Sequence, residues 1–174
     1  MIVFESEKEF ENMLCEHLDN NYFLVEDSGI ESYDRQTNLG AYGITDLIIH
    51  NQELDLDDNK EVFVVSDMLN VVELKITELS SSHLSQIARY KTFFDVTDHG
   101  YDVEYTLVCK KSESYNTDLI FLAQSIDWLT IYTYEISLQK GIVFEILGGF
   151  SLTKDINLSK TLKSIESIFP VGEV

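Results

Sequence analysis

The chain has 174 residues and a formal net charge of −19, and 44% of its residues are apolar and 11% aromatic. This composition excludes a disordered chain, and eight glycines with one proline exclude a collagen-like or linker-like chain. Because no run approaches the ~18 apolar residues of a membrane span and no signal peptide is visible, we expect a cytoplasmic protein without a membrane partner.

The N-terminal part predicts a helix followed by strands, within a single domain that spans residues 1–174. Ser6 and Glu9 form a capping-box pattern, and apolar residues recur at helical spacing up to Leu18. Short segments rich in branched or aromatic residues then predict strands at 22–25, 30–35 and 44–49. The polar stretch 51–60 is interpreted as a solvated loop or hairpin turn, because it lacks the glycine and closing glutamate of a calcium loop.

The rest of the chain alternates between strands and helices. We expect a helix after the N-cap Ser80, and a hairpin turn at Gly141, where glycine tolerates a positive φ. The other expected elements are strands at 61–66, 71–76, 105–109, 128–136 and 142–147, and helices at 118–126 and 157–168. The order α-β-β-β-α-β, with a C-terminal hairpin and helix, predicts an α/β (α+β) fold with a central mixed sheet flanked by helices. Cys15 and Cys109 lie in apolar runs and are expected to be buried and reduced.

The negative charge is unevenly distributed along the chain. Residues 1–74 carry 18 acids and 3 bases, residues 75–111 carry 5 of each, and residues 112–174 balance to −4. An acidic surface repels nucleic acid, which favours a protein partner or a homodimer. The neutral middle segment would instead offer a face that admits a phosphate chain, and its bases are Lys75, Arg89, Lys91, Lys110 and Lys111.

Two apolar strands carry charged residues, which a buried strand excludes unless they are paired or bind a metal. Glu73 and Lys75 lie two residues apart in segment 71–76, so their side chains point to the same face of the sheet. Asp46 is a lone acid in segment 44–49. If the two strands are neighbours, Asp46 and Glu73 converge on one hard cation such as Mg²⁺, with Lys75 beside its bound water. An ordinary surface Glu–Lys pair is the alternative interpretation.

The helix that follows this strand contributes two more polar residues. Gln86 and Tyr90 are four residues apart and lie on one helical face, which would bring two hydrogen-bonding groups to the side of Lys75. His83 lies three residues before Gln86 on the same face, but we interpret it as a surface residue near the helix N-terminus.

The strand acid, the Glu-x-Lys strand and the Gln-x-x-x-Tyr helix together resemble the RecB-like branch of the PD-(D/E)xK nuclease superfamily, over residues 5 to 110. The resemblance implies a restriction-endonuclease-like core, with residues 111–174 as C-terminal additions. It implies that Asp46 and Glu73 bind Mg²⁺ or Mn²⁺ and that Lys75 positions the attacking water. It further implies that Gln86 and Tyr90 support the site and touch substrate phosphate.

A glutamate on the first helix also belongs to this pattern; Glu11 is the candidate, and Glu5 and Glu16 are rivals. Thr45 stands where the motif has a proline. The implied activity is metal-dependent hydrolysis of phosphodiester bonds in nucleic acid, with DNA preferred to RNA. Two alternatives without catalysis remain open: an acidic mimic of nucleic acid that occupies a basic groove on another protein, and an inactive nuclease fold used for assembly.

Overall fold

The computed structural model describes residues 4–18, 30–56, 62–114, 116–137, 141–147 and 154–155. Its helices are α1 (Glu7–Leu18), α2 (Ser81–Val96) and α3 (Thr117–Gln124), with a short 3₁₀ helix, η1 (Gly40–Tyr42). Its strands are β1 (Ile30–Asn38), β2 (Ile44–Leu56), β3 (Val62–Glu78), β4 (Asp102–Lys110), β5 (Leu129–Ser137), β6 (Gly141–Ile146) and the two-residue β7 (Lys154–Asp155).

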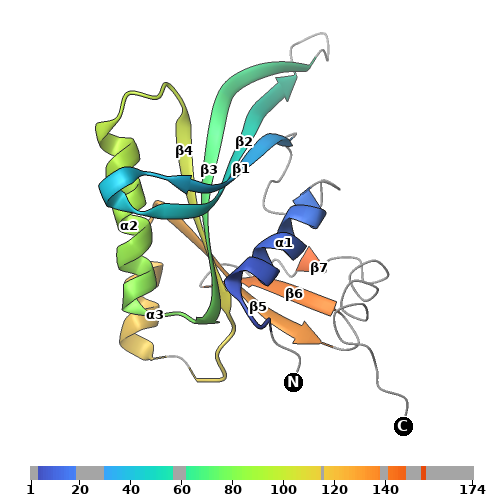
Figure 1. The fold of residues 1–174 in the computed structure, drawn as a ribbon, viewed down its shortest axis with the longest axis vertical. Coiled ribbons are helices and arrows are strands. Elements are labelled where there is room, and N and C mark those ends of the chain that lie inside the picture. The colour runs from blue at the N-terminus through green and yellow to red at the C-terminus, as the bar shows by residue number, and fades with distance from the viewer. Residues whose placement is uncertain are drawn as a thin grey trace.

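All described strands form one mixed sheet in the order β1-β2-β3-β4-β5-β6-β7. The β3–β4 and β4–β5 pairs are parallel, and the other pairs are antiparallel. Helix α1 lies on one face of the sheet, and α2 and α3 lie on the other (Figure 1). The expected α+β class and the order α-β-β-β-α-β are therefore confirmed, as is the hairpin, which turns at Gly141 with a φ of 74°.

Two hydrophobic layers hold the helices against the sheet, and strand alternation assigns residues to them. Leu47 and Ile49 of β2 pack under α1, whereas Ile48 between them packs under α2. Cys15 belongs to the first layer and Cys109 to the second, and both are buried free thiols, as expected. A fully buried Leu or Phe side chain contributes about 1.5–3 kcal/mol, so these layers supply much of the stability.

Helix ends follow the expected capping residues. Ser6 Oγ accepts the Glu9 N–H at 3.2 Å, and Glu9 Oε2 in return accepts the Glu5 N–H at 2.7 Å. Ser80 Oγ accepts the His83 N–H, which starts α2. The start of the third helix is one residue earlier than expected, because the side chain of Asn116 caps it.

Two expectations about the strands are wrong. Segments 61–66 and 71–76 belong to a single long strand, β3, which begins at Val62. Residues 51–56 are part of β2 and not of a loop, because they pair with β3, with a shift of register between Glu53 and Leu54; residues 57–60 of the expected loop or turn lie outside the described residues. The polar residue Asn70 in the middle of β3 is buried but satisfied, since its Oδ1 accepts the Thr106 hydroxyl at 2.9 Å. The expected strand at 22–25 and helix at 157–168 lie outside the described residues.

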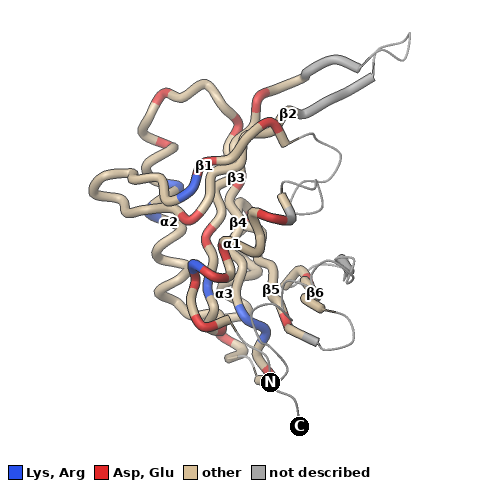
Figure 2. The backbone as a smooth tube through the Cα atoms, turned by 45° about the vertical axis from the view of Figure 1, so that its right-hand side comes forward, with Lys and Arg blue, Asp and Glu red and all other residues tan. Residues whose placement is uncertain are grey.

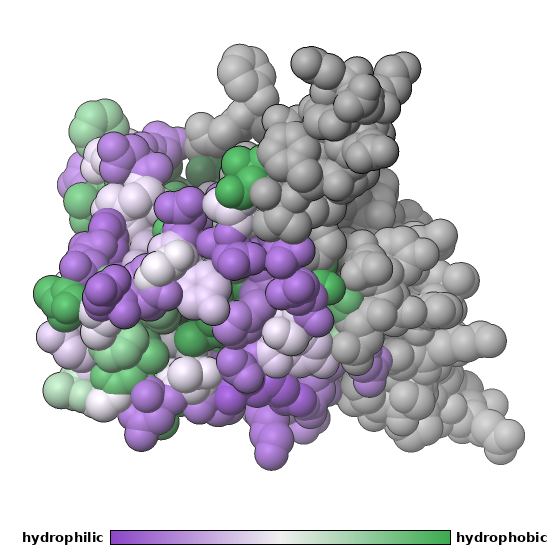
Figure 3. All heavy atoms as spheres, turned by 90° about the horizontal axis from the view of Figure 1, so that it is seen from above, coloured by the Kyte–Doolittle hydropathy of each residue, from purple (hydrophilic) through white to green (hydrophobic). Residues whose placement is uncertain are grey.

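The described surface agrees with the acidic composition. Acidic residues occur along most of the described backbone, whereas basic residues are few (Figure 2). Seen from above, the described atoms are mostly hydrophilic, and hydrophobic side chains form small separate groups (Figure 3). Within the described part of the chain, no helix combines the length and apolar character needed to cross a membrane.

Candidate active site

The candidate site begins where the pairing of β2 and β3 ends. The last pair of this ladder is Leu47↔Val72, so Asp46 is the first residue of β2 beyond it. Its carboxylate continues the connection: Oδ2 accepts the Leu74 N–H at 2.7 Å. The strands thus separate at a point where a carboxylate, only 9% exposed, is held between them.

Glu73 and Lys75 of β3 lie together at this point. Their side chains form an ion pair, with Lys75 Nζ 2.6 Å from Glu73 Oε1. Glu73 is 1% exposed and Lys75 9%, so the alternative of an ordinary surface pair is wrong. Lys75 Nζ also lies 3.3 Å from Oε1 of Glu7, in the first turn of α1. The ammonium group therefore joins the central strand to the first helix.

Helix α2 holds the other oxygen of Glu73. The fully buried Tyr90 hydroxyl lies 3.0 Å from Glu73 Oε2 and 2.5 Å from the Ile44 carbonyl oxygen, and it accepts a hydrogen bond from Gln86 Nε2 at 2.7 Å. A hydroxyl has one proton and cannot donate to both oxygens at once. If the Tyr90 hydroxyl donates to the Ile44 carbonyl, a protonated Glu73 would donate to the Tyr90 oxygen and make the contact between them a hydrogen bond. Tyr90 thus supports Glu73 by direct contact, and Gln86 supports it indirectly, through Tyr90.

The electrostatics of the site point to an excess of buried negative charge. Burial, together with the nearby Asp46 carboxylate, raises the pKa of Glu73 to about 7. Burial also raises the pKa of Asp46, although the Leu74 N–H and Lys75 oppose the shift. Burial alone would lower the pKa of Lys75, but its hydrogen bond and attraction to Glu73 outweigh that effect and raise it. Lys75 therefore stays protonated, and the two carboxylates compete for it.

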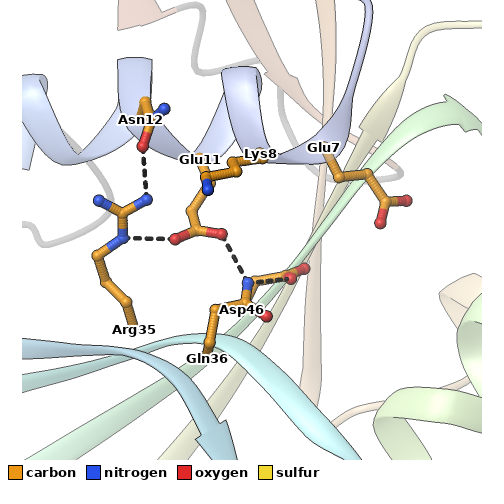
Figure 4. A pocket seen from close by; sticks show the side chains of 7 residues that line it. All are labelled: Glu7, Lys8, Glu11, Asn12, Arg35, Gln36 and Asp46. Atoms are coloured by element: carbon orange, nitrogen blue, oxygen red, sulfur yellow. Dashed lines mark hydrogen bonds and ion pairs between the residues drawn. The ribbon is translucent and has the colours of Figure 1, made fainter.

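A second network connects α1 to Asp46 and borders a pocket of about 640 Å³ (Figure 4). Gln36 Nε2 in β1 donates to Glu11 Oε2 at 2.6 Å and to Asp46 Oδ1 at 3.2 Å. Arg35 donates to Glu11 Oε1 at 2.5 Å and to Asn12 Oδ1 at 2.6 Å. Glu11 is 3% exposed, so the arginine compensates an otherwise buried charge. The pocket is lined by Glu7, Lys8, Glu11, Asn12, Arg35, Gln36 and Asp46.

Several expected residues occupy other positions. Glu5 and Glu16, the rivals of Glu11, are exposed. His83 is half-buried rather than a surface residue, and its Nδ1 has no hydrogen-bond partner among the described residues. Burial and then the charge of Lys75 lower the pKa of His83, which places it near the site.

Of the bases expected on the neutral face, Lys75 lies in the site, whereas Lys91 and Lys111 are paired with acids elsewhere. Lys91 pairs with Asp95 at 2.7 Å and lies over the Trp128 ring, and Lys111 Nζ lies 2.7 Å from Glu145. The residues that sequence reasoning missed are Glu7, Gln36 and the pocket bases Lys8 and Arg35. Glu7 stands in the first turn of a helix, where the helix dipole alone already favours an acid, so its position gave no separate signal of the contact with Lys75.

The donor set fits a hard divalent cation. Mg²⁺ binds through one or two carboxylates and keeps waters or phosphate oxygens as its other ligands. Asp46 and Glu73 supply two such carboxylates, and burial raises the pKa of both, with the Asp46 charge adding to the shift at Glu73. The described residues contain no group of three or more His, Cys, Asp or Glu side chains suited to a metal, so a closed structural metal site is not indicated there.

Comparisons with family models, with curated proteins and with solved structures found no match.

Proposed function

We propose that the chain is a metal-dependent nuclease with a restriction-endonuclease-like core. One observation carries the proposal: two buried carboxylates, Asp46 and Glu73, share the point where β2 and β3 separate, and the buried Lys75 lies 2.6 Å from one of them. Such a cluster contributes little to stability, because burying each charge costs several kcal/mol that pairing only partly offsets. Perturbed buried carboxylates beside a pocket are instead typical of catalytic sites.

Each side chain has a defined task under this proposal. Asp46 and Glu73 hold Mg²⁺ or Mn²⁺, which when bound polarises the phosphate and lowers the pKa of a water. Lys75 presents a protonated amine that orients the attacking water and stabilises negative charge on the phosphate oxygens. Tyr90 and Gln86 keep the Glu73 carboxylate in place through the hydroxyl contact at 3.0 Å.

The pocket next to Asp46 supports a phosphodiester as the substrate. Besides the acids Glu7, Glu11 and Asp46, it is lined by two cations, Lys8 and Arg35, and by the amides of Asn12 and Gln36, and each of these four side chains carries N–H donors. Lys8 is exposed and makes no ion pair within the described residues, so its ammonium is available to a phosphate. The charge of −19 repels nucleic acid at long range. Divalent ions and these local donors would offset that repulsion, and we favour DNA over RNA on the resemblance alone.

Cleavage assays test the proposal. Labelled single- and double-stranded DNA and RNA are incubated with Mg²⁺ or Mn²⁺ and the wild type, Lys75→Ala, Asp46→Asn or Lys91→Ala. We expect metal-dependent cleavage by the wild type and by Lys91→Ala, a lysine control outside the site that pairs with Asp95, and none by the other two. Circular dichroism verifies that Asp46→Asn, a nearly isosteric change, is folded. Absence of cleavage of all four substrates by the wild type, or full activity of Lys75→Ala, would refute the proposal.

The acidic mimic of nucleic acid is the second candidate, and the net charge of −19 favours it. It explains the surface but gives no reason for Asp46, Glu73 and Lys75 to be buried together. A mimic, or an inactive nuclease fold used for assembly, would leave all four substrates intact. A mimic would also gain no thermal stability from Mn²⁺, whereas a ligand that binds only the folded state raises the Tm.

A further inference from the structure

Gln36 has a backbone conformation that its side chain does not favour. Its φ of 51° makes it the one non-glycine residue with a positive φ in the described part of the chain. It lies in β1 directly opposite Asp46, between the pairs Arg35↔Leu47 and Thr37↔Thr45. A left-handed backbone conformation at a non-glycine residue inside a strand costs free energy. It persists only where surrounding contacts stabilise it.

The side chain of Gln36 joins two acids from different elements. Its Nε2 lies 2.6 Å from Glu11 Oε2 and 3.2 Å from Asp46 Oδ1. An amide nitrogen carries two hydrogens, so one can serve each carboxylate. Figure 4 shows the resulting path from Glu11 on α1, through Gln36, to Asp46. The unusual backbone angle and the double hydrogen bond occur at the same residue, which indicates that the first serves the second.

The same contacts fix the orientation of Asp46. Leu74 N–H holds Oδ2 at 2.7 Å and Gln36 holds Oδ1, so both oxygens of the carboxylate are anchored. Each oxygen keeps a second lone pair that can accept a cation. Glu11, by contrast, already has an arginine on one oxygen and Gln36 on the other. Its position suits an indirect role better than that of a metal ligand.

We propose that Gln36 is a positioning residue for Asp46, and that Glu11 acts on the metal site through Gln36. This inference rests on the proposed function, since it assumes that Asp46 binds the metal. Residues that orient a metal ligand contribute about 10- to 100-fold to metal affinity in known sites. The loss of the Gln36 amide should therefore weaken metal binding even where the fold is intact.

Two substitutions separate the side chain from the backbone. Gln36→Gly removes the amide and accepts the positive φ without strain. Gln36→Asn keeps an amide and tolerates the left-handed region, but its reach is shorter by about 1.5 Å, so it cannot span both carboxylates. If position 36 mattered only because its backbone has a positive φ, Gly or Asn would replace Gln36 without loss of Mn²⁺ affinity. Ser32→Gly, at an exposed position of the same strand, is the control for adding a glycine to β1.

Calorimetric titration with Mn²⁺ alone, on the full chain, is the test. We expect Gln36→Gly and Gln36→Asn to bind Mn²⁺ at least about tenfold more weakly than the wild type and Ser32→Gly, while circular dichroism shows that each metal-free variant is folded. Glu11→Gln should weaken binding in the wild type but add nothing in Gln36→Gly, because the two residues act in series.

The outcomes separate the two proposals. Wild-type affinity in both Gln36 variants overturns the positioning role alone, because the metal site itself would be intact. An equal loss from Glu11→Gln in both backgrounds shows that Glu11 acts directly, which also overturns the inference. If the wild type binds no Mn²⁺, the metal site and this inference fail together.

Discussion

Replacing Glu73 with glutamine should change how the stability of the metal-free protein depends on pH. Glu73 is 1% exposed and burial raises its pKa to about 7, from 4.5 in an exposed glutamate. The folded state therefore binds one more proton than the unfolded state between these values, so the free energy of unfolding falls as pH rises through this window. The destabilisation caused by ionised Glu73 is complete above about pH 7 and absent below about pH 4.5.

The size of this effect follows from the shift. One pKa unit corresponds to 1.36 kcal/mol, so Glu73 would cost up to about 3 kcal/mol between these two pH values. With a urea m-value of about 2 kcal/mol/M, that cost would move the unfolding midpoint by roughly 1.5 M. Glutamine has no proton to lose, so Glu73→Gln removes this part of the slope.

Urea unfolding followed by circular dichroism, in the presence of a chelator, measures the effect from about pH 4.5 to 7.5. The difference in stability between the wild type and Glu73→Gln at each pH cancels the contributions of the other acids. Glu104→Gln, at an exposed position of β4, is the matched control and should keep the wild-type slope. Parallel curves for the wild type and Glu73→Gln would refute the reasoning, since they would mean that Glu73 is ionised throughout.

Further predictions concern the surroundings of Glu73. Mn²⁺ affinity should decrease as the pH falls below about 7, because the proton competes for Glu73; calorimetry at several pH values measures this. Tyr90→Phe leaves the Ile44 carbonyl and Glu73 without the hydroxyl, and should lower the free energy of unfolding by about 1–3 kcal/mol in urea titrations. Gly43→Ala should lower the Tm more than Gly100→Ala: both glycines have a positive φ, but only at Gly43 would a Cβ meet Tyr90, 3.2 Å from Cε1. Equal losses at the two glycines would contradict the close approach.

The residues that sequence reasoning identified are those that violate a local rule. Asp46, Glu73 and Lys75 are charged residues within apolar strand segments. Because burying a charge is costly, a charged residue in such a segment stands out in the sequence, and all three are buried in the structure. The helix after Ser80 was predictable for a similar local reason, because its cap and its apolar spacing lie in adjacent residues.

The residues that were missed depend on how distant elements meet. Gln36 carries no signal in its own segment, and its importance follows from a backbone angle and from two partners on α1 and β2. Glu7 approaches Lys75 only because α1 packs across the sheet. The segments 61–66 and 71–76 are one strand in the fold, and Thr106 on the neighbouring strand satisfies the polar Asn70 between them.

The central claim is that Asp46 and Glu73 share one divalent ion, and anomalous diffraction from a crystal soaked in Mn²⁺ tests it most directly. The account predicts a single strong anomalous peak between the two carboxylates, about 2.1 Å from an oxygen of each. No peak at this position, or a peak bound to only one of the two residues, would contradict the claim.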